Sequence, residues 1–153
     1  MTPATDGVAH ESATMSTIRR ALLAILLLGA VGTLSELFLM EHTDGVWQLA
    51  PVVLLGGGVI AIAAHALNQH HVPSIRGFQG LMVVFVLSGI IGIILHYLGN
   101  AEFEREMQPD ARGLLLVKES LMGATPALAP GTMIQLGLIG LAATFRHPAL
   151  REK

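Results

Sequence analysis

The sequence predicts an all-α protein: a four-helix transmembrane bundle with a short amphipathic helical cap between spans three and four. Hydrophobic residues make up 52% of the 153-residue chain and charged residues only 13%, whereas a soluble domain carries about 25% charge. Mean hydropathy is +0.63. Four apolar runs also have roughly the 20 residues that an α-helix needs to cross the hydrocarbon of a bilayer. We therefore expect a lipid bilayer around most of the chain.

The four apolar runs define the expected domain organisation. They occupy residues 18–40, 47–67, 78–98 and 127–145. The membrane domain is expected over residues 18–147, with a disordered N-terminal tail at 1–17 and a short cytoplasmic tail at 148–153. The basic pair before the first run also fits a signal peptide. That run is longer than the roughly 7–15 apolar residues of a signal peptide, and no small-residue cleavage site follows it. We therefore interpret it as a retained span.

The basic residues indicate an orientation. If the N-terminus is cytoplasmic, the inner segments hold six basic residues and the outer segments three. The inner set is Arg19, Arg20, Arg76, Arg146, Arg151 and Lys153, and the outer set is Arg105, Arg112 and Lys118. Because basic residues concentrate in cytoplasmic loops, we expect both termini in the cytoplasm and the protein in a bacterial inner membrane.

The connection between spans three and four, residues 99–124, is expected to form an outer cap. Residues 100–108 continue the third helix or form a short separate one, which Pro109 ends. Residues 111–122 form a second helix, on which Leu114, Val117 and Leu121 share one face. An amphipathic helix at the outer interface accounts for this pattern.

Glu36 and His96 are the polar residues of the spans that stand out. Glu36 lies about 6 Å inside the end of the first span at 1.5 Å per residue, where an unpaired carboxylate is costly. Gly32 shares its face, and Gly92 shares the face of His96. Small-residue faces pack against other helices. We therefore expect Glu36 and His96 to face one cavity near the outer surface.

Three interpretations of this pair remain open. It is a structural link between two helices, a metal site, or a proton-titrating site on a transport path. In the metal interpretation Glu36 and His96 bind a divalent or transition metal as cofactor, as in bundle cores that hold metals. The candidates for further ligands are Glu41, His42, Glu102, Glu106 and Glu119. Neither the paired Glu-x-x-His pattern nor a His-Glu-x-x-His motif is present, so the signal has low specificity.

Several function classes are excluded. The chain has no cysteine, which excludes disulfides, thiolate metal sites and thiol catalysis. Its nine Lys and Arg residues are scattered, so a nucleic-acid partner is not expected. Phosphate-binding, dinucleotide-binding and nucleophile-elbow glycine motifs are absent. We expect a non-enzymatic membrane component that packs with a partner or with itself, in a larger membrane complex or a homo-oligomer. A metal-binding or metal-dependent redox protein and a small proton-coupled transporter subunit are the alternatives.

Overall fold

The computed structural model describes residues 13–68 and 70–150, and this part of the chain is helical with short connections. Five α-helices follow one another and a 3-10 turn closes the described part: α1 (Ala13–Leu39), α2 (Val46–Leu67), α3 (Val72–Met107), α4 (Gly113–Leu121), α5 (Gly131–Ala143) and Pro148–Leu150. The all-α prediction is confirmed for these residues.

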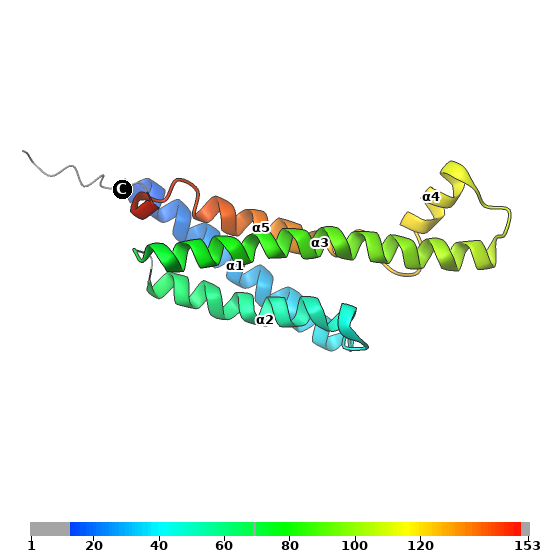
Figure 1. Cartoon of the computed structure of the whole chain (residues 1–153), viewed down its shortest axis with the longest axis horizontal. Coiled ribbons are helices and arrows are strands. Elements are labelled where there is room, and N and C mark those ends of the chain that lie inside the picture. The colour runs from blue at the N-terminus through cyan, green and yellow to red at the C-terminus, as the bar shows by residue number, and fades with distance from the viewer. Residues whose placement is uncertain (1–12, 69, 151–153) are drawn as a thin grey trace, which may run out of the picture.

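The four longer helices pack antiparallel in the ring order α1, α2, α3, α5 (Figure 1). The interface between α3 and α5 is the most extensive. The main contacts of α4 are with α3. The far half of α3 continues past the turn between α1 and α2, and α4 lies beside this continuation (Figure 1). The fold is therefore a four-helix bundle with an arm projecting from one end.

Three of these helices, α1, α2 and α3, are long and apolar enough to cross a membrane. The fourth, α5, is apolar but has only 13 residues. Residues 127–130, at the start of the expected fourth run, form turns instead of helix. Pro130 contributes to this shortening, since a residue that precedes proline is driven out of the helical region.

The boundaries of the other elements differ from the expected ones in two informative places. Helix α1 begins at Ala13, ahead of the expected start at residue 18; the rest of the expected tail, residues 1–12, and residues 151–153 lie outside the described part. Helix α3 runs without a break to Met107, so residues 100–107 extend the third helix. Pro109 follows the end of α3, where the proline ring cannot continue a helix.

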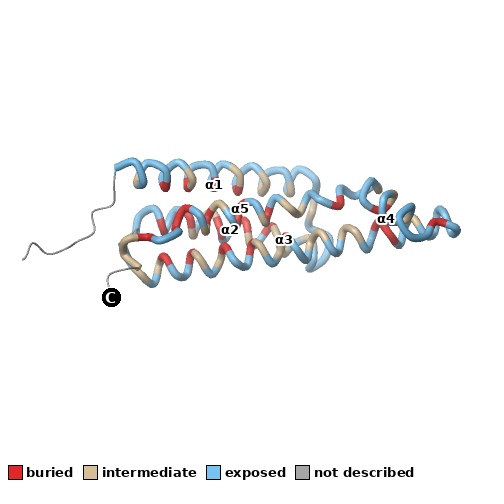
Figure 2. Tube along the Cα trace, turned by 90° about the horizontal axis from the view of Figure 1, so that it is seen from above, coloured by how far each residue is buried: buried red, intermediate tan, exposed pale blue. Residues whose placement is uncertain are grey.

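Glycine sets the close packing between α3 and α5. A Cβ atom at Gly137 would lie 2.6 Å from the backbone oxygen of Met82, and one at Gly89 would lie 2.8 Å from the backbone oxygen of Pro130. Small residues of this kind let helix backbones approach each other in a membrane. The buried side chains, Leu26 and Phe85 among them, lie on the inward sides of the helices (Figure 2).

Candidate functional site

His96 is held by the connection that leads into α5. Its Nδ1 atom lies 3.1 Å from the backbone oxygen of Pro126. A carbonyl oxygen only accepts hydrogen bonds, so Nδ1 of His96 must donate and therefore carries a proton. In the neutral ring the other nitrogen, Nε2, then keeps its lone pair. The structure thus fixes the tautomer of His96 and leaves one basic nitrogen.

His42 lies beside His96, in the turn between α1 and α2. The backbone N–H of His42 donates to the Leu37 oxygen at 2.9 Å, and the preceding residue, Glu41, has a positive φ of 51°. The ring centroids of His42 and His96 are 6.5 Å apart, and the ring planes make an angle of 52°. Burial, and then the neighbouring His96, lower the pKa of His42 below its ordinary value of 6.5. The surroundings of His42 therefore favour its neutral form.

The predicted ligand set is not assembled in the part of the chain that the structure describes. Glu36 is exposed on α1, and its side chain forms no hydrogen bond or ion pair with other described residues. Glu102 and Glu106 are exposed on the extension of α3, and Glu119 pairs with Lys118 at 3.2 Å. Within residues 13–68 and 70–150, no three His, Asp or Glu side chains gather closely enough to hold a metal ion.

Asn100 fixes the arm to the bundle. It is 4% exposed, and its Nδ2 atom donates to the backbone oxygens of Ser120 at 2.9 Å and Thr125 at 2.6 Å. Its Oδ1 atom accepts from the Thr125 N–H at 3.2 Å. Gly123 packs directly against this amide. One side chain on α3 therefore positions both the end of α4 and the start of the path into α5.

Arg19 ties together the opposite end of the bundle. Its guanidinium is buried and donates to the backbone oxygens of Ala143 at 2.5 Å, Phe145 at 2.9 Å and Arg146 at 3.4 Å. These carbonyls follow the last turn of α5, where oxygens lack intrahelical partners and the helix dipole is negative. Arg19 therefore caps α5 from α1.

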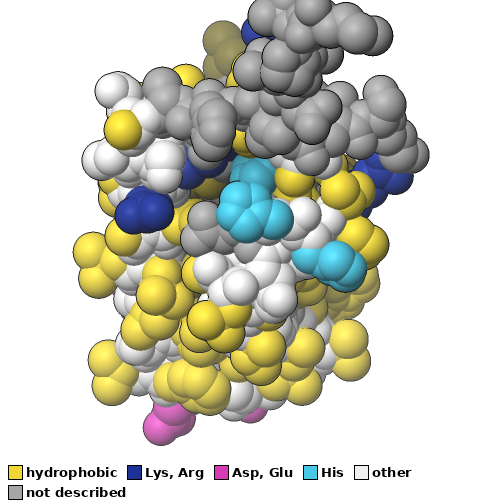
Figure 3. Space-filling view, turned by 90° about the vertical axis from the view of Figure 1, so that its left-hand side faces the viewer, with side chains coloured by type: hydrophobic (Ala, Val, Ile, Leu, Met, Phe, Trp, Pro, Cys, Tyr) yellow, Lys and Arg dark blue, Asp and Glu magenta, His cyan; other side chains and the backbone are white. Residues whose placement is uncertain are grey.

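A second histidine pair lies near Arg19. His65 is 3% exposed and stacks on Phe78, with ring centroids 4.7 Å apart and planes 16° apart. The centroid of His147 lies 6.4 Å from that of His65. Figure 3 shows histidine side chains gathered on this end, among apolar and basic ones. This end is thus polar in its interior and carries fixed positive charge.

Sequence reasoning named His42 only among several further ligands for the site of Glu36 and His96, and it missed the pair of His65 with His147 and the role of Arg19. His42 and His147 lie in connections, and their partners lie on helices far away in the chain. Arg19 figured only in the count of charges that sets orientation. The pair Arg19 and Arg20 at the start of an apolar helix was the available signal, because a guanidinium beside lipid needs partners for its donors. No local pattern indicates which carbonyls supply them.

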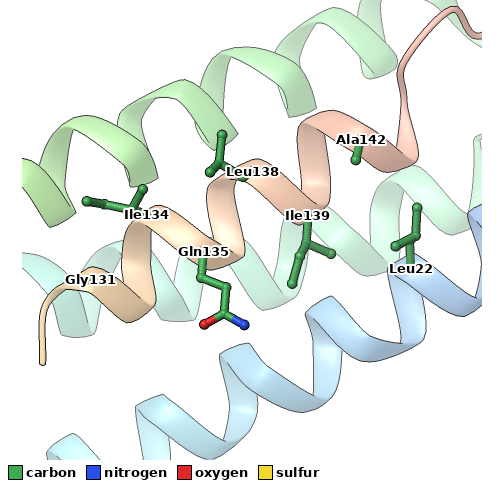
Figure 4. A pocket seen from close by; sticks show the side chains of 7 residues that line it. All are labelled: Leu22, Gly131, Ile134, Gln135, Leu138, Ile139 and Ala142. Atoms are coloured by element: carbon green, nitrogen blue, oxygen red, sulfur yellow. The ribbon is translucent and has the colours of Figure 1, made fainter.

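One open groove runs along α5. It is lined by Leu22 from α1 and by Gly131, Ile134, Gln135, Leu138, Ile139 and Ala142. Gln135 points from α5 toward α1 (Figure 4), and its side chain forms no hydrogen bond with other described residues. The remaining lining is apolar, as expected of a surface covered by lipid tails. The residues that line this groove therefore include no ionisable side chain.

Comparisons with known proteins add no relative: no family model, no curated protein and no solved structure matches this chain. The class defined by the fold is that of an all-helical protein with apolar helices suited to a membrane.

Proposed function

We propose that this protein is a non-enzymatic membrane component that crosses the bilayer four times and docks a second protein through its arm, residues 99–125. What supports this is the exposed apolar surface at the tip of the arm. Leu114 is 88% exposed and Met107 65%. Exposed apolar patches of this kind mark interaction sites when water would otherwise cover them.

Lipid does not reach the tip of the arm in this arrangement. The apolar part of α3 ends near Leu98, and α3 continues to Met107. At 1.5 Å per residue, the added residues extend α3 by about 13 Å, whereas the headgroup layer on each side of a bilayer is about 5–8 Å thick. Met107 therefore stands in water above the headgroups if α3 runs along the membrane normal, and Leu114 lies in the first turn of the helix that follows it.

The arm is also preformed. Asn100 holds α4 and the path into α5 by three hydrogen bonds, and Ser120 is fully buried against α3. A surface that is rigid before binding loses less conformational entropy when it docks. The apolar tip is thus suited to bind a protein in its existing shape.

Charge favours a different protein over a second copy as the occupant. Residues 99–125 hold three basic and five acidic side chains, the acids being Glu102, Glu104, Glu106, Asp110 and Glu119. Two arms of the same net negative charge repel each other, whereas a partner with basic residues around an apolar centre is attracted. In the proposed orientation, with both termini in the cytoplasm, this partner lies on the outer side of the membrane.

The test uses a photo-reactive amino acid at position 114 of the full-length protein in its native membranes. We expect one adduct of defined mass, heavier than the protein by a single partner. That partner is then purified, and its affinity is measured against the wild type, Leu114→Gln and the control Arg112→Gln, which changes an exposed arm residue. Leu114→Gln should weaken binding at least tenfold, and Arg112→Gln should weaken it much less. An adduct between two copies, or no adduct, contradicts the proposal.

A further inference from the structure

We infer that His42 and His96 together bind one transition-metal ion of the class that prefers imidazole nitrogen, with Cu²⁺ as the tightest binder and Zn²⁺ and Ni²⁺ as weaker ones. This site is independent of the docking surface on the arm. It differs from the core ligand pair expected from sequence, because His42, there only one of several further ligands, takes the place given to Glu36.

The first support is the tautomer of His96. Histidine ligands of metals typically donate their second ring N–H to a carbonyl or carboxylate, which orients the ring and raises its basicity. His96 already makes this bond, from Nδ1 to the oxygen of Pro126 at 3.1 Å. The bond occupies only the nitrogen that a metal does not need. The structural role of His96 and a ligand role through Nε2 are therefore compatible.

The second support is the spacing of the two rings. An ion about 2.0–2.1 Å from each nitrogen requires the two nitrogens to lie about 4 Å apart or less. Rings with centroids 6.5 Å apart come close to this limit once one nitrogen of each ring turns toward the other, and binding also requires the two rings to move closer together. His96 is anchored, so the adjustment falls on His42, whose ring forms no hydrogen bond with other described residues and projects from a turn.

The third support is the contrast with the other histidine pair. His65 and His147 have nearly the same centroid separation, 6.4 Å, but they lie beside the buried Arg19 guanidinium. A fixed positive charge close to the pair repels a cation. His42 and His96 have no Lys or Arg among their ring or hydrogen-bond contacts, so theirs is the pair suited to a metal ion.

Ligand chemistry sets the metal class. Two imidazoles suit Cu²⁺, Zn²⁺ and Ni²⁺, whereas Mg²⁺ and Ca²⁺ prefer oxygen ligands. With the same ligands, affinity is higher for Cu²⁺ than for Ni²⁺ or Zn²⁺. Since no third His, Asp or Glu of the described residues joins the pair, water completes the coordination shell. The site is therefore open to an added ligand.

The test is Cu²⁺ titration of the full-length protein in detergent, after removal of any histidine tag and of bound metal. Calorimetry gives stoichiometry and affinity, and electron paramagnetic resonance counts the coordinating nitrogens. We expect one Cu²⁺ per chain with two nitrogen ligands. His42→Gln and His96→Gln should each weaken binding at least tenfold. The control His70→Gln changes an exposed histidine in another connection and should leave affinity unchanged.

The outcomes separate the site from its alternatives. If His96→Gln loses the fold through its Pro126 contact, His42→Gln still decides, and circular dichroism monitors folding of each variant. If the wild type binds Cu²⁺ no more tightly than His42→Gln does, the inference is overturned. A spectrum with one nitrogen, or a loss of affinity in His70→Gln equal to that in His42→Gln, shows an adventitious ion only.

Discussion

Replacing Arg19 by methionine tests whether a single side chain holds α1 to the end of α5. The guanidinium donates to the oxygens of Ala143 at 2.5 Å and Phe145 at 2.9 Å, and more weakly to Arg146 at 3.4 Å. Methionine fills much of the same volume but donates nothing. The carbonyls at the end of α5 then lose their partner together with the favourable charge at the negative end of the helix dipole.

The magnitude follows from the two short bonds. A hydrogen bond to a charged group contributes about 1.5–3 kcal/mol, so two contribute about 3–6 kcal/mol. The lower end applies, because water or headgroups at the end of the bundle replace part of what is lost. We therefore expect Arg19→Met to lower the free energy of unfolding by about 3 kcal/mol.

The assay is unfolding in mixed micelles with increasing sodium dodecyl sulfate, followed by circular dichroism. The matched control is Arg20→Met, which removes the same charge from an exposed neighbour and should change stability by less than about 0.5 kcal/mol. Equal losses in the two variants would show that net charge, rather than the bonds to α5, carries the effect. A loss below about 0.5 kcal/mol in Arg19→Met would refute the reasoning outright.

Three further predictions concern the arm, the helix packing and pH. Asn100→Ala removes three hydrogen bonds and should cost about 2–4 kcal/mol and speed amide exchange across α4, whereas Asn68→Ala removes one exposed bond and should cost little. Gly137→Ala places a methyl group against backbone atoms and should lower stability by about 1–3 kcal/mol, while Gly80→Ala meets open space and should be neutral or slightly stabilising; thermal melts of both decide. Because the pKa of His42 lies below 6.5 when folded, the unfolded chain binds more protons below that pH, and stability should fall as pH drops from 7.5 to 5.5. In metal-free protein, His42→Gln should make stability fall less steeply between pH 7.5 and 5.5. An equally steep fall in the variant would show that His42 is not the group responsible.

The sequence by itself determined the helical, membrane-suited character of the chain and most helix positions. Apolar runs of bilayer length are a local property, because each helix satisfies its own backbone hydrogen bonds in lipid. The positions of α2 and of the apolar part of α3 follow from this alone. The glycine pattern indicated close packing, which holds for Gly89 against α5 and for Gly92 against Pro130 but is wrong for Gly32, where a Cβ atom would meet open space.

Only the tertiary structure decided which polar groups meet. Glu36 and His96 seemed matched by depth and by their small-residue faces, yet depth does not fix which side of a helix faces which neighbour. The turn after α1 instead brings His42 beside His96. Likewise Arg19 meets the end of α5 only because the chain returns to the same end of the bundle. Such contacts depend on helix order and rotation, which arise from packing between distant segments and leave no periodic signal in the sequence.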